Sequence, residues 1–524
     1  MENVTSVRRL FPESLKANDL VEAQGESGMG VLKFQLTSPD LASRAPELRK
    51  AFITGLDRTP NHLRVELRNG LMFCHRENNE SGRLFVPWAV EGHGTPIIGT
   101  ATLIERPEPY NLAVELARGK LNEVRNQLAD WRQMGLRAPA ELDRVMSEAQ
   151  RAFVKAATSA DDAEASYTAA QASLAGVSKA ADLLMDAYTG QVLQTRLSAA
   201  PKLPTLLGCG LAGEPKHSPW LVEMVGTLNL VQVGVPWKAL EPTEGQYRWD
   251  ELDAQVVWAR RHKLQVQGGP VLELRPNALP DWIWLWEGDF ETILGLVEDL
   301  VRNVVTRYRG KVPTWHLVHR PASSDFLGLS EEEQIRITAR ALQIARQADP
   351  AAQVTIGLDR PWGEWMGQSA FQLGPLHLAD YLVRADLGLA GLFLEIAPGY
   401  SPPGSHIRDL FDFSKLLDLY SLLNLPLHVG LVFPSDACPD PKADPTVRVE
   451  PAQWPGPPED ATQIHWGAKW IALAVAKPFV RSVTWIQPTD AIPHLYPHGG
   501  LFRGDNTAKP LVHWLKSFRR ELLA

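Results

Sequence analysis

Short apolar runs and longer amphipathic stretches alternate along the chain between residues 199 and 524. The runs are rich in β-branched and apolar residues, whereas apolar positions in the longer stretches, such as 292–308 and 331–347, recur at helical spacing. The candidate strands are residues 206–210, 228–235, 264–274, 314–319, 354–358, 391–396, 427–432 and 482–487. Eight β/α units in about 320 residues predict an α/β fold, a (β/α)8 TIM barrel with its site at the carboxyl ends of the strands.

The segment before this barrel has a different pattern. Residues 30–106 contain short β-like runs separated by turn residues and predict a small β-rich domain. Residues 107–198 are rich in Ala, Glu, Leu, Arg and Gln, with apolar residues at helical spacing, and predict a helical hairpin or bundle. Residues 1–29 are expected to be an amino-terminal tail.

Composition narrows the class of protein. Of the 524 residues, 44% are hydrophobic and 22% charged, and no run approaches 18 apolar residues, so we expect no membrane partner. The net charge of -8 is spread along the chain, which argues against nucleic acid as a partner. The first twenty residues contain no apolar secretory core, and the three cysteines (Cys74, Cys209 and Cys438) form no disulfide framework or CxxC pair. These features predict a cytoplasmic protein.

Three sequence features suggest ligands but have simpler interpretations. Residues 208–213 match the dinucleotide fingerprint GxGxxG, but the Glu-Pro-Lys-His-Ser-Pro segment that follows is a poor start for a helix, so no cofactor is expected. Histidines three apart on a strand point to opposite faces, so a metal at His316 and His319 is not expected. His494 and His498 lie in a proline-containing loop and could converge, although solvated loop histidines are the commoner case.

Tryptophans 282, 284 and 286 follow a candidate strand end. Their rings could stack on sugars, but packing between the loop and its helix is the more frequent role of such residues.

Four stretches in the predicted barrel, in the same order, are similar to motifs of one enzyme family. Residues 237–253 are similar to K-W-x-x-x-E-P-x-x-G-x-F-x-F-x-x-x-D, residues 279–282 to L-P-x-W, and residues 307–320 to R-Y-K-G-K-I-x-x-W-D-V-V-N-E. Thr484-Trp485, Leu501-Phe502 and Lys509-Pro510 are similar to the last-strand elements. The barrel therefore resembles glycoside hydrolase family 10, the endo-β-1,4-xylanases, whose members are (β/α)8 barrels.

The sequence departs from the family pattern at the positions of the catalytic and sugar-binding residues. The resemblance implies that the acid/base glutamate is replaced by Arg320, preceded by His319, and the nucleophile by Leu431. An arginine cannot deliver a proton at neutral pH, and a leucine cannot attack an anomeric carbon. Family sugar-binding positions are also changed, at Pro236, Gly269, Glu395 and Ala397.

Other polar residues remain near the predicted strand ends. The candidate relocated acids are Glu273, Glu395 and Asp490, and the candidate barrel-mouth binding residues are His319, Arg320, Asp359, His428 and Trp485. In the alternative interpretation, Glu273 or Glu395 pairs with Arg275, Arg320 or Arg360 in a buried network that stabilises the barrel.

Two hypotheses follow from these residues. In the preferred one, the chain is a catalytically degenerate family 10-like barrel that binds glycans or acts as a scaffold, with a polysaccharide or oligosaccharide as candidate partner and residues 107–198 as a candidate self-association surface. In the alternative, it is an active O-glycosyl hydrolase with a relocated carboxylate pair. Unpaired acids about 5 Å or 6.5–9.5 Å apart would favour hydrolysis, and acids held by arginines would favour the first hypothesis.

Overall fold

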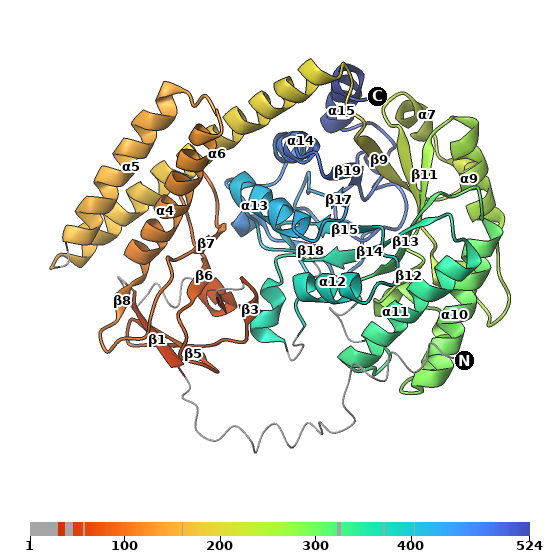
Figure 1. Cartoon of the computed structure of the whole chain (residues 1–524), viewed down its shortest axis with the longest axis horizontal. Helices are drawn as coiled ribbons and strands as arrows, with labels where there is room; N and C mark the ends of the chain where they lie inside the picture. The colour runs from red at the N-terminus through yellow and green to blue at the C-terminus, as the bar shows by residue number, and fades with distance from the viewer. Residues whose placement is uncertain are drawn as a thin grey trace.

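A computed structural model describes residues 30–36, 46–55, 58–159, 161–321, 326–369, 373–402 and 404–524. The expected tail, residues 1–29, lies outside the described residues. Figure 1 shows the helices and sheets of the amino-terminal part on one side and a barrel of strands ringed by helices on the other.

The carboxyl-terminal part is a closed barrel of parallel strands. The strand order is β11-β10-β9-β19-β17-β15-β14-β13-β12, and β11 also pairs with β13, which closes the ring. Because β11 and β12 both pair with β13, they share one position and the barrel has eight. The strands are β9 Leu206–Leu211, β10 Leu230–Val233, β11 Gln265–Gly268, β12 Leu272–Glu273, β13 Thr314–His319, β14 Gln353–Asp359, β15 Gly391–Ile396, β17 Leu427–Leu431 and β19 Val480–Trp485. The expected TIM-barrel fold is confirmed.

Helices surround the barrel because most of its strands are followed by an amphipathic segment, and some of these segments carry a clear start signal (Figure 1). Helix α11 begins with a capping box in which Ser330 and Glu333 each bond the other's backbone N–H, and α10 begins at the N-cap Asp289. The helices are α7 Leu221–Val225, α8 Trp237–Leu240, α9 Asp250–Arg261, α10 Phe290–Arg307, α11 Glu331–Ala348, α12 Pro375–Arg384, α13 Leu410–Ser421, α14 Asp460–Ala476 and α15 Pro510–Leu522. A short antiparallel pair, β16 Tyr400–Ser401 and β18 Arg448–Val449, joins two loops.

The first described residues form two four-stranded sheets, of order β4-β5-β1-β8 and β3-β2-β6-β7. Alternating positions such as Leu32 and Phe34 on one strand and Leu84 and Val86 on another are buried in a common core. The strands are β1 Gly30–Gln35, β2 Phe52–Thr54, β3 Pro60–Asn61, β4 Arg64–Arg68, β5 Leu71–Arg76, β6 Arg83–Pro87, β7 Ile97–Gly99 and β8 Tyr110–Asn111.

Three long helices connect these sheets to the barrel: α4 Leu112–Gln133, α5 Ala140–Thr158 and α6 Ala163–Ala199. Leu112 and Leu116 of α4 belong to the core of the sheets, whereas later residues of α4 and α6 belong to the core of the barrel. Ion pairs reinforce the junction, since Lys120 Nζ lies 2.6 Å from Asp409 and Lys415 Nζ lies 2.7 Å from Glu123. The helices therefore brace the sheets against α13 and α14.

Within the described ranges, every helix is too short or too polar to traverse a lipid bilayer.

Candidate functional site

A β-bulge in β13 brings two histidines to the same side of the barrel wall. The register between β13 and β14 shifts between His316 and Val318, which adds one residue to β13. Both imidazoles consequently face Gly357 on β14, and their ring centroids lie 4.9 Å apart. The expectation that His316 and His319 point to opposite faces is wrong, because strand alternation is interrupted at Leu317.

Gly357 leaves the space that the two imidazoles occupy. A Cβ at this position would lie 2.1 Å from His316 Nε2 and 2.2 Å from His319 Nδ1. Any larger residue at position 357 would therefore displace the histidine pair. Burial lowers the pKa of His316 well below its ordinary value, so this imidazole is neutral inside the barrel.

Glu395, at the carboxyl end of β15, is the centre of the network at the barrel mouth. Its Oε2 accepts a hydrogen bond from His319 Nε2 at 2.6 Å, and its Oε1 accepts one from Arg320 at 2.8 Å. The hydroxyl of Tyr496 also donates to Glu395 Oε1. Three donors thus hold one buried carboxylate.

Arg320 connects two of the candidate acids. It follows β13 directly, in a left-handed conformation with φ 63°, and its backbone N–H donates to Gly357 O at 3.0 Å. Its Nε lies 3.8 Å from Glu273 Oε1, which also accepts from Arg275 Nε at 3.0 Å. Left-handed backbone in a non-glycine residue costs free energy and is found where the surroundings enforce it.

Electrostatics keeps these carboxylates ionised. Burial alone would raise the pKa of Glu395, but Arg320 and His319 lower it well below its ordinary value. The pKa of Glu273 is lowered in the same way by Arg275 and Arg320, against the effect of burial. At Asp359, burial is likewise outweighed by Arg360 and Arg320, which lower the pKa.

Asp490, the third candidate relocated acid, lies outside this network. Its Oδ2 accepts from Lys509 Nζ at 2.6 Å, and its Oδ1 accepts from Gln487 Nε2 at 3.0 Å and from Gly500 N at 2.7 Å. The structure therefore brings Glu273 and Glu395 together around Arg320, and it places Asp490 in the loop that follows β19.

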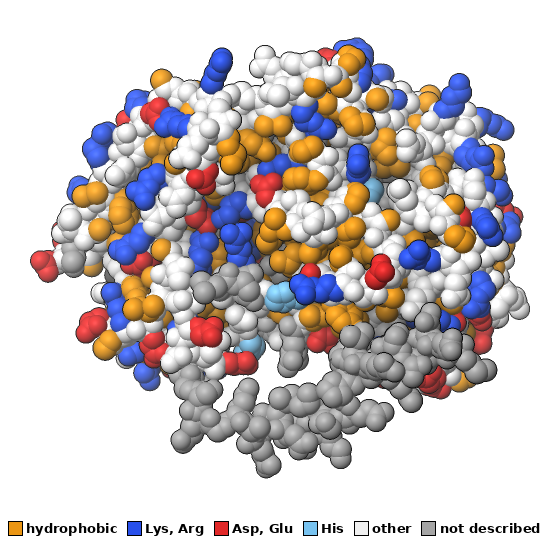
Figure 2. Space-filling model, viewed as in Figure 1, with side chains coloured by type: hydrophobic (Ala, Val, Ile, Leu, Met, Phe, Trp, Pro, Cys, Tyr) orange, Lys and Arg blue, Asp and Glu red, His pale blue; other side chains and the backbone are white. Residues whose placement is uncertain are grey.

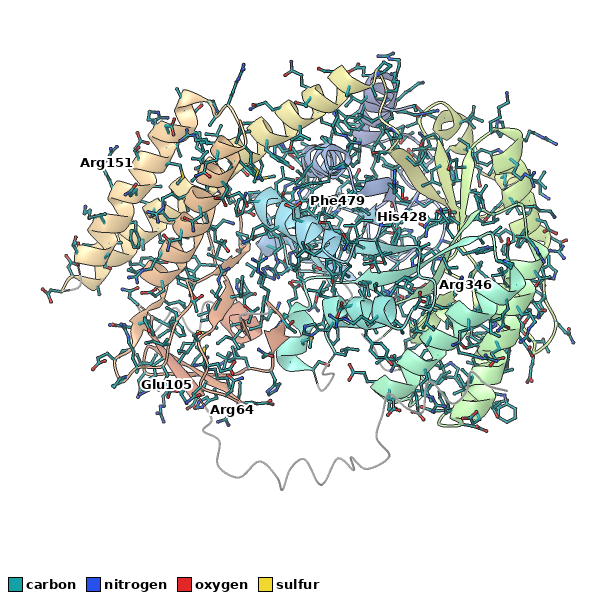
Figure 3. The ribbon with its side chains drawn as sticks, in the orientation of Figure 1. Arg64, Glu105, Arg151, Arg346, His428 and Phe479 are labelled. Atoms are coloured by element: carbon teal, nitrogen blue, oxygen red, sulfur yellow. The ribbon has the colours of Figure 1, made fainter. Side chains whose placement is uncertain are left out.

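Two expected barrel-mouth residues lie elsewhere. His428 is the second residue of β17, near its amino end, where its Nδ1 lies 2.8 Å from Ser482 Oγ among the barrel strands (Figure 3). The sequence pattern identified the strand but not which of its ends carries the histidine. Trp485 is buried, donates from Nε1 to Gly499 O at 2.8 Å, and lies against Gly467 of α14.

Leu431 is fully buried and pairs in register with Trp485 and with Ile396. Alternation along the strands places these three side chains on the face opposite Glu395 and its neighbour Gly430. Leu431 therefore packs in the core between strands and helices rather than beside Glu395.

Aromatic side chains close the barrel mouth over Glu395. Tyr496 is 1% exposed and Tyr400 is 1% exposed, and their rings lie 4.9 Å apart in a small cluster with Ala397 and Val432. Glu395 itself is 5% exposed. Sequence reasoning missed Tyr496 because its contact with Glu395 bridges 101 positions; the only local signal was its place between His494 and His498.

The side chain of His494 is only 4% exposed, contrary to the expectation of a solvated loop residue. Its Nε2 lies 2.9 Å from Asp440 Oδ2, and Asp440, Asp490 and His494 each offer a ligand atom within 4.8 Å of the others. In the described part of the chain, this is the one group of three such side chains with the spacing of a metal site.

A cavity of about 330 Å³ lies where the amino-terminal sheets meet the barrel. Its lining combines the rings of Phe52, Phe85 and Trp362 with the cationic side chains of Arg83 and Arg408. Basic side chains gather beside α13 at this junction (Figure 2). The cavity leaves no local signal in the sequence, because its walls come from separate parts of the chain.

The remaining sequence motifs have structural roles. Gly208 and Gly210 lie inside β9, so the glycine fingerprint is not a strand-to-helix turn that could hold a pyrophosphate. Trp282 Nε1 donates to Glu241 O at 2.8 Å, and its ring packs edge-on against Trp237. Trp286 packs against the barrel core, whereas Trp284 is 37% exposed.

Comparison with known proteins agrees with the sequence motifs. The model of Glycosyl hydrolase family 10 matches residues 231–357, from β10 through most of β14. The barrel is glycoside hydrolase family 10-like. The matched range of this xylanase-like barrel includes His319 and Arg320 and ends before Glu395 and Leu431.

Curated proteins named endo-1,4-beta-xylanases are similar to about a quarter of the chain. Endo-1,4-beta-xylanase 2 of Claviceps purpurea is 29% identical over 133 residues, which are 24% of this chain and 39% of that protein. Endo-1,4-beta-xylanase 3 of Hypocrea jecorina is 31% identical over 134 residues, 24% of this chain and 37% of that protein. The alignments thus span about two fifths of these relatives' length.

Solved structures similar to the chain include native xylanase 10B from Thermotoga maritima, with a TM-score of 0.46 and 17% identity, covering 61% of this chain and 95% of that one. A family 10 structure from Paenibacillus barcinonensis has a TM-score of 0.46 and 19% identity, covering 64% of this chain and 98% of that one.

Proposed function

We propose that this chain is a catalytically degenerate family 10-like barrel that binds a glycan or acts as a scaffold. One observation carries the proposal: each candidate acid is held by a cation. Arg320 and His319 hold Glu395, Arg275 holds Glu273, and Lys509 holds Asp490.

This pairing is unsuited to glycoside hydrolysis. A general acid must keep a proton near neutral pH, and a nucleophilic carboxylate must reach the anomeric carbon. The cations lower the pKa of Glu395 and of Glu273 instead of raising either, although burial opposes them. Arg320 contacts Glu395 at 2.8 Å and approaches Glu273 to 3.8 Å, so its guanidinium lies between the two acids.

Replacement of the family glutamates is part of the same proposal. Arg320 lies inside the range matched by the family model and directly follows β13, which supports its equivalence to the family acid/base. The proposed equivalence of Leu431 to the nucleophile rests on the sequence motif alone, since residue 431 lies beyond the matched range and its side chain packs away from Glu395.

The junction cavity is our candidate for the glycan-binding surface. Relatives of the barrel are named endo-1,4-beta-xylanases, so xylan is the first polysaccharide to test. Sugar rings pack against aromatic faces, and the cavity presents Phe52, Phe85 and Trp362 beside polar and charged groups. Arg83 and Arg408 in its lining are paired with Glu123 and Glu364, so the aromatic rings and not these cations are the candidate contacts for a sugar.

The test measures hydrolysis and binding on one panel of α- and β-linked polysaccharides, including xylan and uronic-acid-bearing xylan. We expect no release of reducing ends by the wild-type chain, with an active family 10 xylanase as positive control. We expect retardation of the wild-type chain in gels containing its glycan, and weaker retardation of Trp362→Ala. Turnover that Glu395→Gln or Glu273→Gln abolishes would instead establish the active hydrolase with a relocated acid pair.

Three further expectations belong to this proposal. The division into residues 30–106, 107–198 and 199–524 is kept as the domain organisation. Residues 107–198 are proposed to self-associate through α5 and the turn after α4, where Val154 and Met134 are exposed. A cytoplasmic location is supported by the exposed free thiol of Cys438, which a reducing compartment would preserve.

A further inference from the structure

We propose that Asp440, Asp490 and His494 form a binding site for a single zinc-class divalent metal ion at the edge of the barrel mouth. Asp440 comes from the loop after β17, and Asp490 and His494 come from the loop after β19. One ligand atom from each lies within 4.8 Å of the others, which is the spacing of groups that share one ion.

The tautomer of His494 is set from outside the cluster. Its Nδ1 lies 2.8 Å from Ile492 O, and because a carbonyl oxygen only accepts, Nδ1 must carry the proton. Nε2 then faces Asp440 Oδ2 at 2.9 Å, either as a lone pair beside a carboxylate or as the N–H of a charged imidazolium. A metal-ligating histidine usually donates one ring N–H to an acceptor such as a backbone carbonyl and turns its other nitrogen to the ion, and His494 turns that nitrogen toward the carboxylates of the cluster.

His498 repeats this arrangement. Its Nε2 lies 2.8 Å from Cys438 O and must donate, so that Nδ1 faces Asp440 Oδ2 at 3.7 Å. Two imidazoles, each with one ring nitrogen donating to a backbone carbonyl, thus converge on one carboxylate oxygen. His498 is placed to join the ion as a further ligand.

The carboxylates are oriented by neighbouring donors. Asp440 accepts from the backbone N–H groups of Lys442 and His498, both at 3.1 Å. Among the described residues, its ion pairs are with His494 and His498 rather than with a lysine or arginine. Asp490 is oriented by Gly500 N and Gln487, while Lys509 balances part of its charge. In metal sites, a second layer of hydrogen-bond donors usually holds the ligating carboxylates in this way.

Access and ligand chemistry decide the kind of ion. Asp440, Asp490 and His498 line a cavity of about 470 Å³, which provides an entry path and room for water as a remaining ligand. Imidazole nitrogen together with carboxylate oxygen suits Zn²⁺ and its first-row neighbours, whereas Ca²⁺ and Mg²⁺ prefer oxygen ligands alone.

The ion would fix the segment that covers the barrel mouth. Tyr496, which donates to Glu395, lies between the proposed ligand His494 and its neighbour His498. By joining the loop after β17 to the loop after β19, the ion would hold this tyrosine in place.

Zinc binding to the full chain tests the proposal. The chain is prepared without a histidine tag, stripped with a chelator, and titrated with ZnCl₂ by calorimetry, with bound zinc counted by mass spectrometry. We expect one ion per chain, and a loss of affinity on the order of 100-fold or more in Asp440→Asn and in His494→Gln.

His513→Gln is the matched control, because His513 is exposed on α15 and its Nδ1 lies 4.0 Å from Glu223. This variant should bind zinc like the wild-type chain. Less than one zinc per chain, equal binding by His494→Gln, or preference for Ca²⁺ over Zn²⁺ would overturn the proposal.

A second measurement avoids dependence on variants that fail to fold. Co²⁺ replaces zinc in the wild-type chain, and proton NMR is recorded for resonances shifted by the paramagnetic ion. We expect a shifted, slowly exchanging imidazole N–H, because the Nδ1 proton of His494 is bonded to Ile492 O. A Co²⁺-loaded chain without a shifted imidazole N–H would contradict ligation by His494.

Discussion

Carboxylates lie beside histidines both at the barrel mouth, around Glu395, and at the loop edge, the cluster of Asp440, Asp490 and His494 in the loops after β17 and β19. The two regions differ in how the negative charge is balanced. At the mouth, Glu395 is surrounded by Arg320, His319 and Tyr496 and is almost completely buried. At the edge, Asp440 faces two histidines next to a cavity of about 470 Å³. The difference is in what balances the charge: Arg320 holds Glu395 at the mouth, whereas at the edge Lys509 balances Asp490 and the described ion-pair partners of Asp440 are imidazoles beside an open cavity.

The largest expected effect comes from removing the cation at the mouth. Arg320→Met leaves the Glu395 carboxylate buried without its main partner, and such a change costs about 3–5 kcal/mol of unfolding free energy. Adding Glu395→Gln should restore part of this loss, because the uncompensated charge is then removed. Urea unfolding measures both variants. In the control Arg302→Met, an exposed pair with Asp299 on α10 is lost, and the change should stay below about 1 kcal/mol. An equally small effect of Arg320→Met would show that the mouth does not depend on this pair.

Zinc bound by Asp440, Asp490 and His494 should stabilise the folded chain. At a free concentration 100 times its dissociation constant, an ion that binds only the folded state adds about 2.7 kcal/mol to the unfolding free energy. Urea unfolding of the stripped chain with and without ZnCl₂ measures this increment. We expect it to vanish in His494→Gln and to persist in His513→Gln. Stabilisation of His494→Gln by the same amount would place the ion elsewhere.

Substituting Gly357 tests the packing of the histidine pair. The Cβ of Gly357→Ala would meet His316 Nε2 and His319 Nδ1 at 2.1 and 2.2 Å, so we expect a loss of about 1–3 kcal/mol in unfolding free energy. Gly190→Ala is the control, because a Cβ there has no neighbour within 4 Å and alanine favours the α6 helix. The control should be neutral or stabilising; tolerance of Gly357→Ala would mean that the two imidazoles can move apart.

The smallest expected effect is the pH dependence due to His428. Burial lowers the pKa of His428 from 6.5 to about 4, so between these values the unfolded chain binds a proton that the folded chain does not. This contribution to stability is present above pH 6.5 and is lost as the pH falls toward 4. Urea unfolding between pH 6.5 and about pH 5 should give a decrease that is smaller in His428→Gln by about 1–2 kcal/mol. An unchanged pH dependence in the variant would exclude His428 as a source.

The sequence pattern predicted the barrel because its strands are short, buried and separated by amphipathic helices. The run 314–319 coincides with β13, and 391–396 coincides with β15. The run 264–274 is instead divided into β11 and β12, since Gly269 and Pro270 interrupt its pairing. Periodicity marks where a strand lies but does not show such interruptions.

Much less of the site could be predicted, since its geometry depends on contacts distant in sequence. The pairing of Glu395 with Arg320 was foreseen as the network alternative, because both lie at strand ends that converge in a barrel. The bulge that turns His316 inward leaves no mark on hydrophobic periodicity. Likewise, the approach of Asp440 to His494 depends on two loops meeting, which local patterns do not encode.

The central claim is that Glu395 is a structural counter-ion and not a general acid. Carbon-13 NMR of labelled glutamate carboxyls, with the Glu395 signal assigned from Glu395→Gln, measures its pKa directly. The account predicts a pKa below the ordinary 4.5, because Arg320 and His319 outweigh the effect of burial, and a higher value in Arg320→Met. A pKa raised well above 4.5 in the wild-type chain would contradict the account, because a general acid requires such a shift.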